Sequence, residues 1–221
     1  MWSLVWSPSS FLGRRLRGRR HWPSALAAPA LCGLLQGAGA LVLGIRTEGA
    51  LEAALPDRLA AGAAPYRPVV AVAVALGYPL LCCLVILAVL SLNVWARRPG
   101  PPDRLAELTA LAFYTQVPYC VATLLVAGWW DPPAMPPLAD RSAVATLEGV
   151  LRYRDAVLAE PLPSTTRLLA IYSLLWLSAV TALALRLTAG LSRGATAVAG
   201  AVVGLLCAGA PLTRWLLDLA R

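Results

Sequence analysis

The sequence predicts an all-α fold, a polytopic transmembrane helical bundle of about five spans that forms a single integral membrane domain over residues 1–221. Apolar residues make up 59% of the chain and charged residues only 14%, against about 25% charged in typical soluble domains. A soluble fold of this length could not bury so much apolar surface, because many residues of a small domain contact water. The apolar residues also gather in long uncharged runs, and about 20 helical residues cross a bilayer core.

Residues 1–23 are predicted to form an interfacial segment that leads into the first span. Aromatic and apolar side chains are mixed there with arginine, a composition that favours the headgroup boundary. A cleaved signal peptide is the alternative, but the apolar run that follows is longer than such a peptide needs and further spans come after it. The candidate contacts for anionic lipid headgroups are Arg14, Arg15, Arg17, Arg19 and Arg20.

Spans one and two are predicted at about 24–45 and 69–95. Span one contains Gly33 and Gly37, small residues four apart that let another helix approach closely. Span two contains Pro79, which predicts a kink because proline lacks a backbone donor and its ring collides with the preceding turn.

Span three is predicted at about 105–130, and its centre is the most polar part of any span. Burying an amide and hydroxyl groups in hydrocarbon costs a few kcal/mol unless they find partners. Two interpretations follow: the patch makes interhelical hydrogen bonds beside a proline kink, or it lines a wet path through the membrane. The residues of this patch are Tyr114, Thr115, Gln116, Pro118 and Tyr119.

An outer loop is predicted at 131–167, between spans three and four, with an amphipathic helix over 142–160. Prolines at 161 and 163 are predicted to end that helix. Spans four and five follow at about 168–187 and 195–217. The candidate helix-interface residues of span five are Gly200 and Gly204.

No combination of residues typical of a catalytic, cofactor or metal site occurs, so a non-enzymatic protein without a cofactor is expected. Carboxylates are predicted in loops or at span ends, as with Glu107 and Asp218, and none inside a span. His21 is the single histidine, and the five cysteines lie in apolar runs without a C-x-x-C pair. The net charge of +8 does not predict nucleic-acid binding, because the arginine cluster lies beside an apolar span.

The arginine cluster also predicts the orientation, because positive charge next to a span resists translocation. We expect a cytoplasmic N-terminus and, with five spans, a C-terminus outside. All 19 basic residues are arginine, and alanine, glycine and proline are frequent, which is typical of a GC-rich genome. The expected location is therefore the cytoplasmic membrane of a bacterium, in contact with anionic lipid headgroups.

Three stretches of the chain resemble the Yip-domain family, the Ypt/Rab-interacting-protein-like membrane proteins. In the third span, DRLAELTALAFYTQVPYCVATLL carries the tyrosine and the Val-Pro step of that family as Tyr114 and Val117-Pro118. The two other stretches, over residues 7–31 and 175–203, resemble the opening of the family and its hairpin between spans four and five.

The resemblance implies a five-span bundle with a cytoplasmic N-terminus. Eukaryotic members work in vesicle trafficking and contact Rab-type GTPases, largely through a long N-terminal region. Only about 23 residues precede span one here, so that role is not carried over and a prokaryotic-type member is expected. The expected function is a scaffold or partner-binding subunit that contacts a membrane protein or a second copy; the alternative is a small transporter or channel subunit with its path at the span-three patch.

Overall fold

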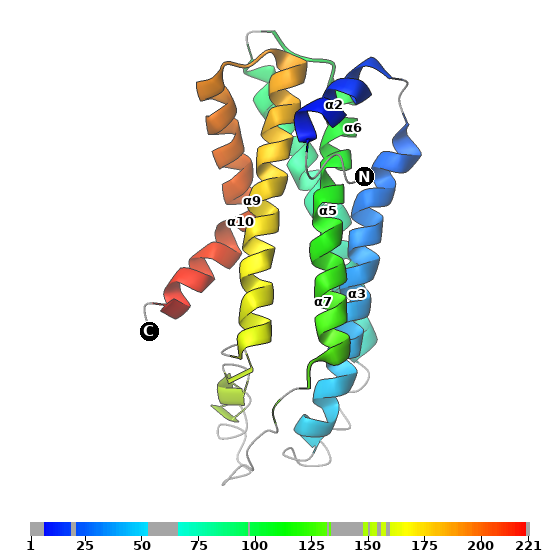
Figure 1. Cartoon of the computed structure of the whole chain (residues 1–221), viewed down its shortest axis with the longest axis vertical. Helices are drawn as coiled ribbons and strands as arrows, with labels where there is room; N and C mark the ends of the chain where they lie inside the picture. The colour runs from blue at the N-terminus through cyan, green and yellow to red at the C-terminus, as the bar shows by residue number, and fades with distance from the viewer. Residues whose placement is uncertain are drawn as a thin grey trace. The chain divides into compact units, whose positions relative to one another are not determined.

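The structure is a computed structural model, which describes residues 7–18, 21–52, 66–96, 98–131, 133, 148–149, 151–153, 156–157 and 160–219. Every regular element in this part of the chain is helical, so the predicted all-α fold is confirmed (Figure 1). Five of the described helices are long and apolar enough to cross a membrane: Trp22–Thr47, Pro68–Val94, Pro102–Trp129, Ser164–Ala189 and Arg193–Thr213. The chain is therefore a multi-span integral membrane protein, and the predicted spans agree with these segments to within a few residues.

The bounds of the described helices are α2 (Pro8–Arg17), α3 (Trp22–Glu52), α5 (Tyr66–Val94), α6 (Pro102–Ala112), the 3₁₀ helix η1 (Phe113–Gln116), α7 (Val117–Trp129), α9 (Pro161–Ala189) and α10 (Arg193–Leu219). Short segments connect α2 to α3, α5 to α6, and α9 to α10. The prediction that 161–167 belongs to a loop is wrong, because α9 already begins at Pro161. A proline is tolerated in the first turn of a helix, where its missing N–H has no intrahelical acceptor.

The chain forms two compact units, and the boundary between them cuts across the long helices. Unit 1 consists of Met1–Gly33, Leu76–Tyr119 and Leu169–Arg221, and unit 2 consists of Leu34–Ala75 and Cys120–Leu168. Helices α3, α5, α7 and α9 each contribute residues to both units.

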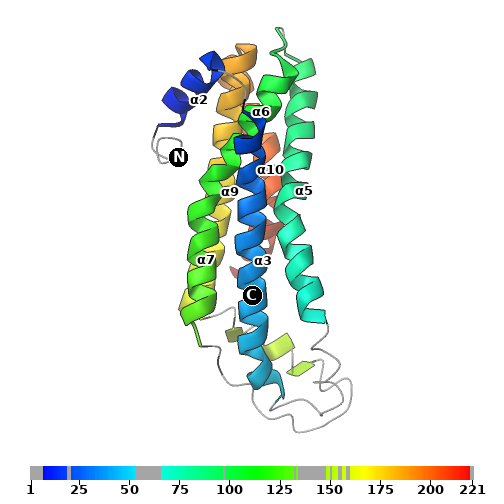
Figure 2. The same cartoon turned by 90° about the vertical axis from the view of Figure 1, so that its right-hand side faces the viewer.

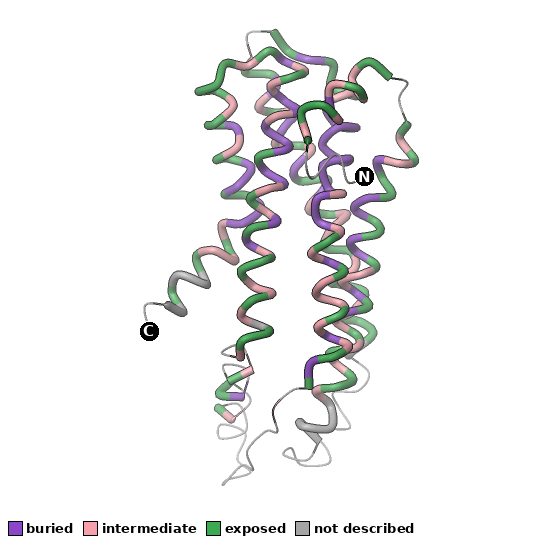
Figure 3. The backbone as a smooth tube through the Cα atoms, viewed as in Figure 1, coloured by how far each residue is buried: buried purple, intermediate pink, exposed green. Residues whose placement is uncertain are grey.

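The core of unit 1 is built around α6. Every residue of this helix from Leu105 to Ala112 is buried, while α5 and α10 contain many exposed residues, as the colouring of α10 in Figure 3 shows. The residues that pack into the same core come from α2, α3, α5, α9 and α10 and include Leu12, Ala28, Val85, Val89, Leu177, Leu185 and Val203. Because this stretch of α6 is enclosed by other helices, its polar residues Glu107 and Thr109 are kept away from lipid.

Two glycines shape the connections at one end of unit 1. The amide of Asn93 bonds the backbone of Gly100 in both directions: its Nδ2 donates to the Gly100 carbonyl at 3.0 Å, and the Gly100 N–H donates to Oδ1 at 2.9 Å. A Cβ at Gly100 would lie 2.8 Å from the Thr188 carbonyl oxygen, so only glycine fits there. Gly190 ends α9 with φ +63°, a left-handed conformation that L side chains adopt at a cost, and donates its N–H to the Arg186 carbonyl at 2.9 Å.

The N-terminal segment that is predicted to be interfacial contains the helix α2, which contacts α6 (Figure 2). Leu12 is fully buried in the core of unit 1, whereas Arg14 and Arg17 remain exposed. The guanidinium of Arg15 lies 5.8 Å from the centre of the Phe11 ring, within range of a cation–π interaction. This segment is thus an amphipathic helix docked on the protein, with its charges directed outward.

The amphipathic helix predicted over 142–160 lies largely outside the described residues. The described positions 148–149, 151–153 and 156–157 are helical, and Arg152 lies 3.7 Å from Glu148 one turn earlier. Tyr153 is buried, and this burial, together with the charge of Glu160, raises the pKa of its hydroxyl above the ordinary range.

Candidate functional site

Gln116, the most polar residue of the span-three patch, is fully buried and bonded to α9 through both ends of its amide. Its Nε2 donates to the Ser173 carbonyl oxygen at 2.6 Å, and the Ser173 hydroxyl donates to its Oε1 at 3.0 Å. A buried amide in hydrocarbon is costly unless it is paired, and here both the oxygen and the nitrogen are used. The pair therefore joins the third span to the fourth inside unit 1.

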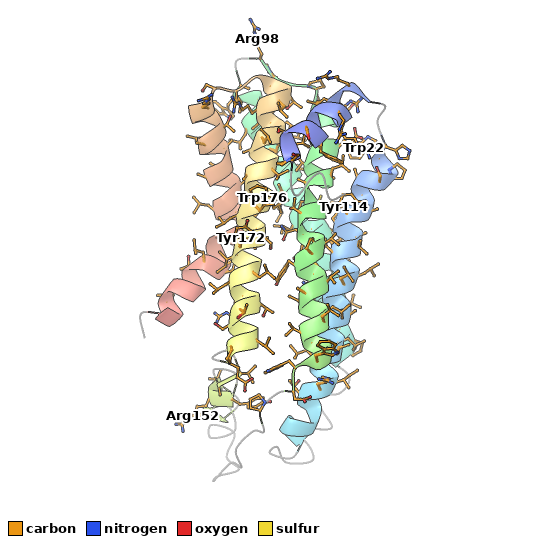
Figure 4. The ribbon with its side chains drawn as sticks, viewed as in Figure 1. Trp22, Arg98, Tyr114, Arg152, Tyr172 and Trp176 are labelled. Atoms are coloured by element: carbon orange, nitrogen blue, oxygen red, sulfur yellow. The ribbon has the colours of Figure 1, made fainter. Side chains whose placement is uncertain are left out.

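The neighbouring residues of the patch are also used within the chain. Tyr114 reaches α3, where its hydroxyl donates to the Ser24 carbonyl at 2.8 Å (Figure 4). The Thr115 hydroxyl donates to the Ala112 carbonyl at 2.7 Å, one turn back along its own span. Pro118 is exposed and Tyr119 is half-buried. These contacts support the interpretation as interhelical hydrogen bonds more than the interpretation as a wet path.

The 3₁₀ turn η1 has a direct cause in Pro118. A proline cannot donate to the carbonyl four residues earlier, here that of Tyr114. The Val117 N–H donates to this carbonyl instead, in the tighter i→i+3 pattern of a 3₁₀ helix. The change of pattern lets the third span continue through Pro118 without leaving the Tyr114 carbonyl unpaired.

Glu107 is a buried carboxylate that sequence reasoning placed at a span end. It is 1% exposed, and it lies near the start of the candidate span Pro102–Trp129, at the span end where the sequence predicts it. Its Oε1 accepts the backbone N–H of His21 at 2.9 Å, and its Oε2 accepts Nη1 of Arg104 at 3.1 Å. Nη2 of Arg104 donates to the Gly18 carbonyl.

The cluster of Glu107 and Arg104 links the third span to the chain between α2 and α3. A buried charge is tolerated when it is paired and hydrogen-bonded, and here each oxygen of the Glu107 carboxylate accepts a hydrogen bond. The sequence does hold one signal for this pair, an arginine three residues before a glutamate on one helix face.

The glycines predicted at helix interfaces lie between helices of this chain. In unit 2, a Cβ on Gly37 would come within 2.8 Å of the Ala71 carbonyl oxygen and of Ala75 Cβ, so α3 and α5 approach closely there. In unit 1, added Cβ atoms on Gly200 and Gly204 would lie 3.4 Å from Ala182 Cβ and Ser178 Oγ of α9, respectively. Gly33 is buried.

The described arginines of the N-terminal cluster lie at one end of unit 1. Helix α2, the loop that carries Arg98 and the start of α10 share this end (Figures 1 and 4). Arg14, Arg17, Arg98 and Arg193 are exposed there, and Arg15 is half-buried. The predicted headgroup contacts Arg19 and Arg20 lie outside the described residues. A cytoplasmic position for this end stays a prediction.

Within the described ranges, no three His, Cys, Asp or Glu side chains come close enough together to hold a metal ion. Comparison with models of protein families, with curated proteins and with solved structures gave no match to this chain. The resemblance to the Yip-domain family therefore stays a prediction.

Proposed function

We propose that this protein is a non-enzymatic membrane subunit of the Yip-domain type, which acts as a scaffold by binding a second membrane-spanning chain. The observation that carries the proposal is that the polar groups of the third span are paired inside the chain. The Gln116 amide is bonded to Ser173 and the Tyr114 hydroxyl to Ser24. A transport path would need such groups to be open to a passing solute.

The face that we assign to the partner lies on α5. Four residues spaced by four, three and four positions are exposed on the unit 1 part of this helix: Leu76, Leu80, Cys83 and Leu87. Helices that pack against each other in a left-handed coiled coil place their contact residues at this spacing, and here a small cysteine lies among the leucines. We call these four residues the α5 seam. Gly37, Gly200 and Gly204 lie against neighbouring helices of the same chain, so they are not assigned to the partner.

Placing a bulky residue in the α5 seam is expected to prevent the partner from binding, so that it is no longer recovered with the chain. The full-length chain carrying Leu80→Trp is purified by affinity in a mild detergent and compared with the wild-type chain. Leu205→Trp is the matched control, because Leu205 is an exposed leucine on α10 outside the seam. We expect a stoichiometric partner, either another chain or a second copy, with the wild type and with Leu205→Trp but not with Leu80→Trp. A wild-type chain that elutes as a monomer without a partner would contradict the proposal.

Replacing Gln116 with leucine separates a scaffold from a transporter. The change leaves the Ser173 hydroxyl without the Gln116 oxygen and should lower the free energy of unfolding by about 1–3 kcal/mol. Partner recovery from the purification above should stay at the wild-type level. The control is Thr181→Val on α9: among the described atoms the Thr181 hydroxyl has no hydrogen-bond partner, so its loss should cost little. If Gln116→Leu folds as stably as Thr181→Val but abolishes solute flux in vesicles, the transporter alternative is correct.

A further inference from the structure

Unit 2 contains a cavity of about 310 Å³ between its helices. Its walls come from residues 36–43 of α3, residues 123–127 of α7 and the first turns of α9. Helix α5 contributes Val74, and Val157 also lines the cavity. Gly39, Leu43 and Val126 form apolar walls, and Trp130 closes part of the cavity with a side chain that is itself buried. At about 30 Å³ for each water-sized group, this volume takes about ten such groups, for example methylenes.

The cavity begins at the end of the membrane spans and extends into them. The third candidate span ends at Trp129 and the fourth begins at Ser164, so Trp130 and Arg167 lie near the headgroup boundary. Thr123 also lines the cavity, and it lies about 9 Å deeper than Trp129 along the helix axis. Leu43 and Val74 of the lining are 37% and 36% exposed, so apolar side chains of the cavity wall also reach the outer surface of the helices.

The polar side chains of the wall are bonded to protein groups. Nε2 of Gln36 donates to the Thr123 hydroxyl at 2.7 Å, and the Trp130 indole N–H donates to the Glu160 carboxylate at 2.7 Å. The carbonyl of Trp130 accepts Nη1 of Arg46 at 2.9 Å. With these donors already used, the wall offers an occupant mainly apolar contacts, which suit a hydrocarbon chain better than a cluster of waters.

Arg167 is the charged residue of the described lining, and it lies at the headgroup end. A guanidinium presents five donors and binds phosphate through parallel hydrogen bonds, so it can hold a lipid phosphate alongside its contacts within the protein. We propose that the cavity binds one anionic phospholipid from the bilayer, with part of an acyl chain inside and the phosphate on Arg167. This inference needs the membrane spans but not the partner-binding function.

The test uses the full-length chain in nanodiscs of phosphatidylcholine with phosphatidylglycerol, released and weighed by native mass spectrometry. We expect the wild-type chain to retain one phosphatidylglycerol in preference to phosphatidylcholine. Filling the cavity with Ala40→Leu or neutralising the phosphate contact with Arg167→Gln should weaken retention by about tenfold or more. The controls are Ala38→Leu, an exposed position of α3 outside the cavity, and Arg193→Gln at the start of α10, which should retain the lipid as the wild type does.

Three results would overturn the proposal, and the first two need no variant. The wild-type chain could release every phosphatidylglycerol, or retain phosphatidylcholine equally well, which would show that the cavity does not select an anionic phospholipid. Equal retention by Ala40→Leu and Ala38→Leu, with both variants helical by circular dichroism, would show that the bound lipid lies elsewhere. If Ala40→Leu does not fold, Ala127→Leu fills the cavity from α7 and is judged in the same way.

Discussion

Replacing Glu107 with alanine is expected to lower the free energy of unfolding by about 3–5 kcal/mol, the cost of breaking a buried ion pair from one side. The side chains of Glu107 and Arg104 are 2% and 18% exposed, so little water can replace the lost partner. The change leaves the Arg104 guanidinium without its carboxylate and the backbone N–H of His21 without its acceptor. An unpaired buried charge and an unpaired donor both add to the cost.

The measurement is reversible unfolding of the full-length chain in mixed micelles with a denaturing detergent. Asp103→Asn is the matched control, since Asp103 is an exposed acid in the first turn of the same helix, where the helix dipole and an exposed contact each contribute at most about 1 kcal/mol. Glu107→Gln should fall between the two, because an amide can still accept the His21 N–H but cannot balance the arginine charge. Equal losses for Glu107→Ala and Asp103→Asn would refute the role of the buried pair.

The second large effect is expected at Gly37, where even one methyl group should destabilise unit 2. A Cβ would lie 2.8 Å from the Ala71 carbonyl oxygen, which belongs to the backbone of α5 and cannot move without shifting that helix. Overpacking of this kind costs about 1–3 kcal/mol. Gly37→Ala should therefore lower the free energy of unfolding, although alanine is the better helix former.

The control for Gly37 is Gly77→Ala on α5, measured by the same unfolding experiment. No described atom lies within 4 Å of a Cβ at Gly77, so the alanine meets open space. Its higher helix propensity should then leave stability unchanged or raise it by up to about 1 kcal/mol. A similar gain for Gly37→Ala would mean that α3 and α5 are not in close contact at this point.

The spans could be predicted from the sequence because a membrane demands long uncharged runs, and such runs are visible residue by residue. The start of α9 could not be predicted, since Pro161 is compatible with the end of one helix and with the first turn of the next. Propensity does not distinguish these two cases; the packing of the following residues does.

The sequence predicts the polar residues of the third span but not their hydrogen-bond partners on other spans. An amide in an apolar run stands out, so Gln116 was identified, but its partner Ser173 is an ordinary small residue in another apolar run. Pairings across about 57 residues depend on which helix faces meet, and the sequence of one chain does not contain that information. The burial of Glu107 could not be predicted for the same reason, because it requires α2 to lie against α6.

The contacts of Arg104 and Glu107 constrain the length of the connection between α2 and α3 more than its sequence. Arg104 bonds the carbonyl of Gly18, and Glu107 bonds the N–H of His21, so both contacts use groups that every residue except proline possesses. The imidazole of His21 takes no part in either bond, and many side chains could stand in its place. One residue more or fewer between Gly18 and His21 would instead shift one of these backbone groups by about 3.5 Å, beyond hydrogen-bond range of the pair.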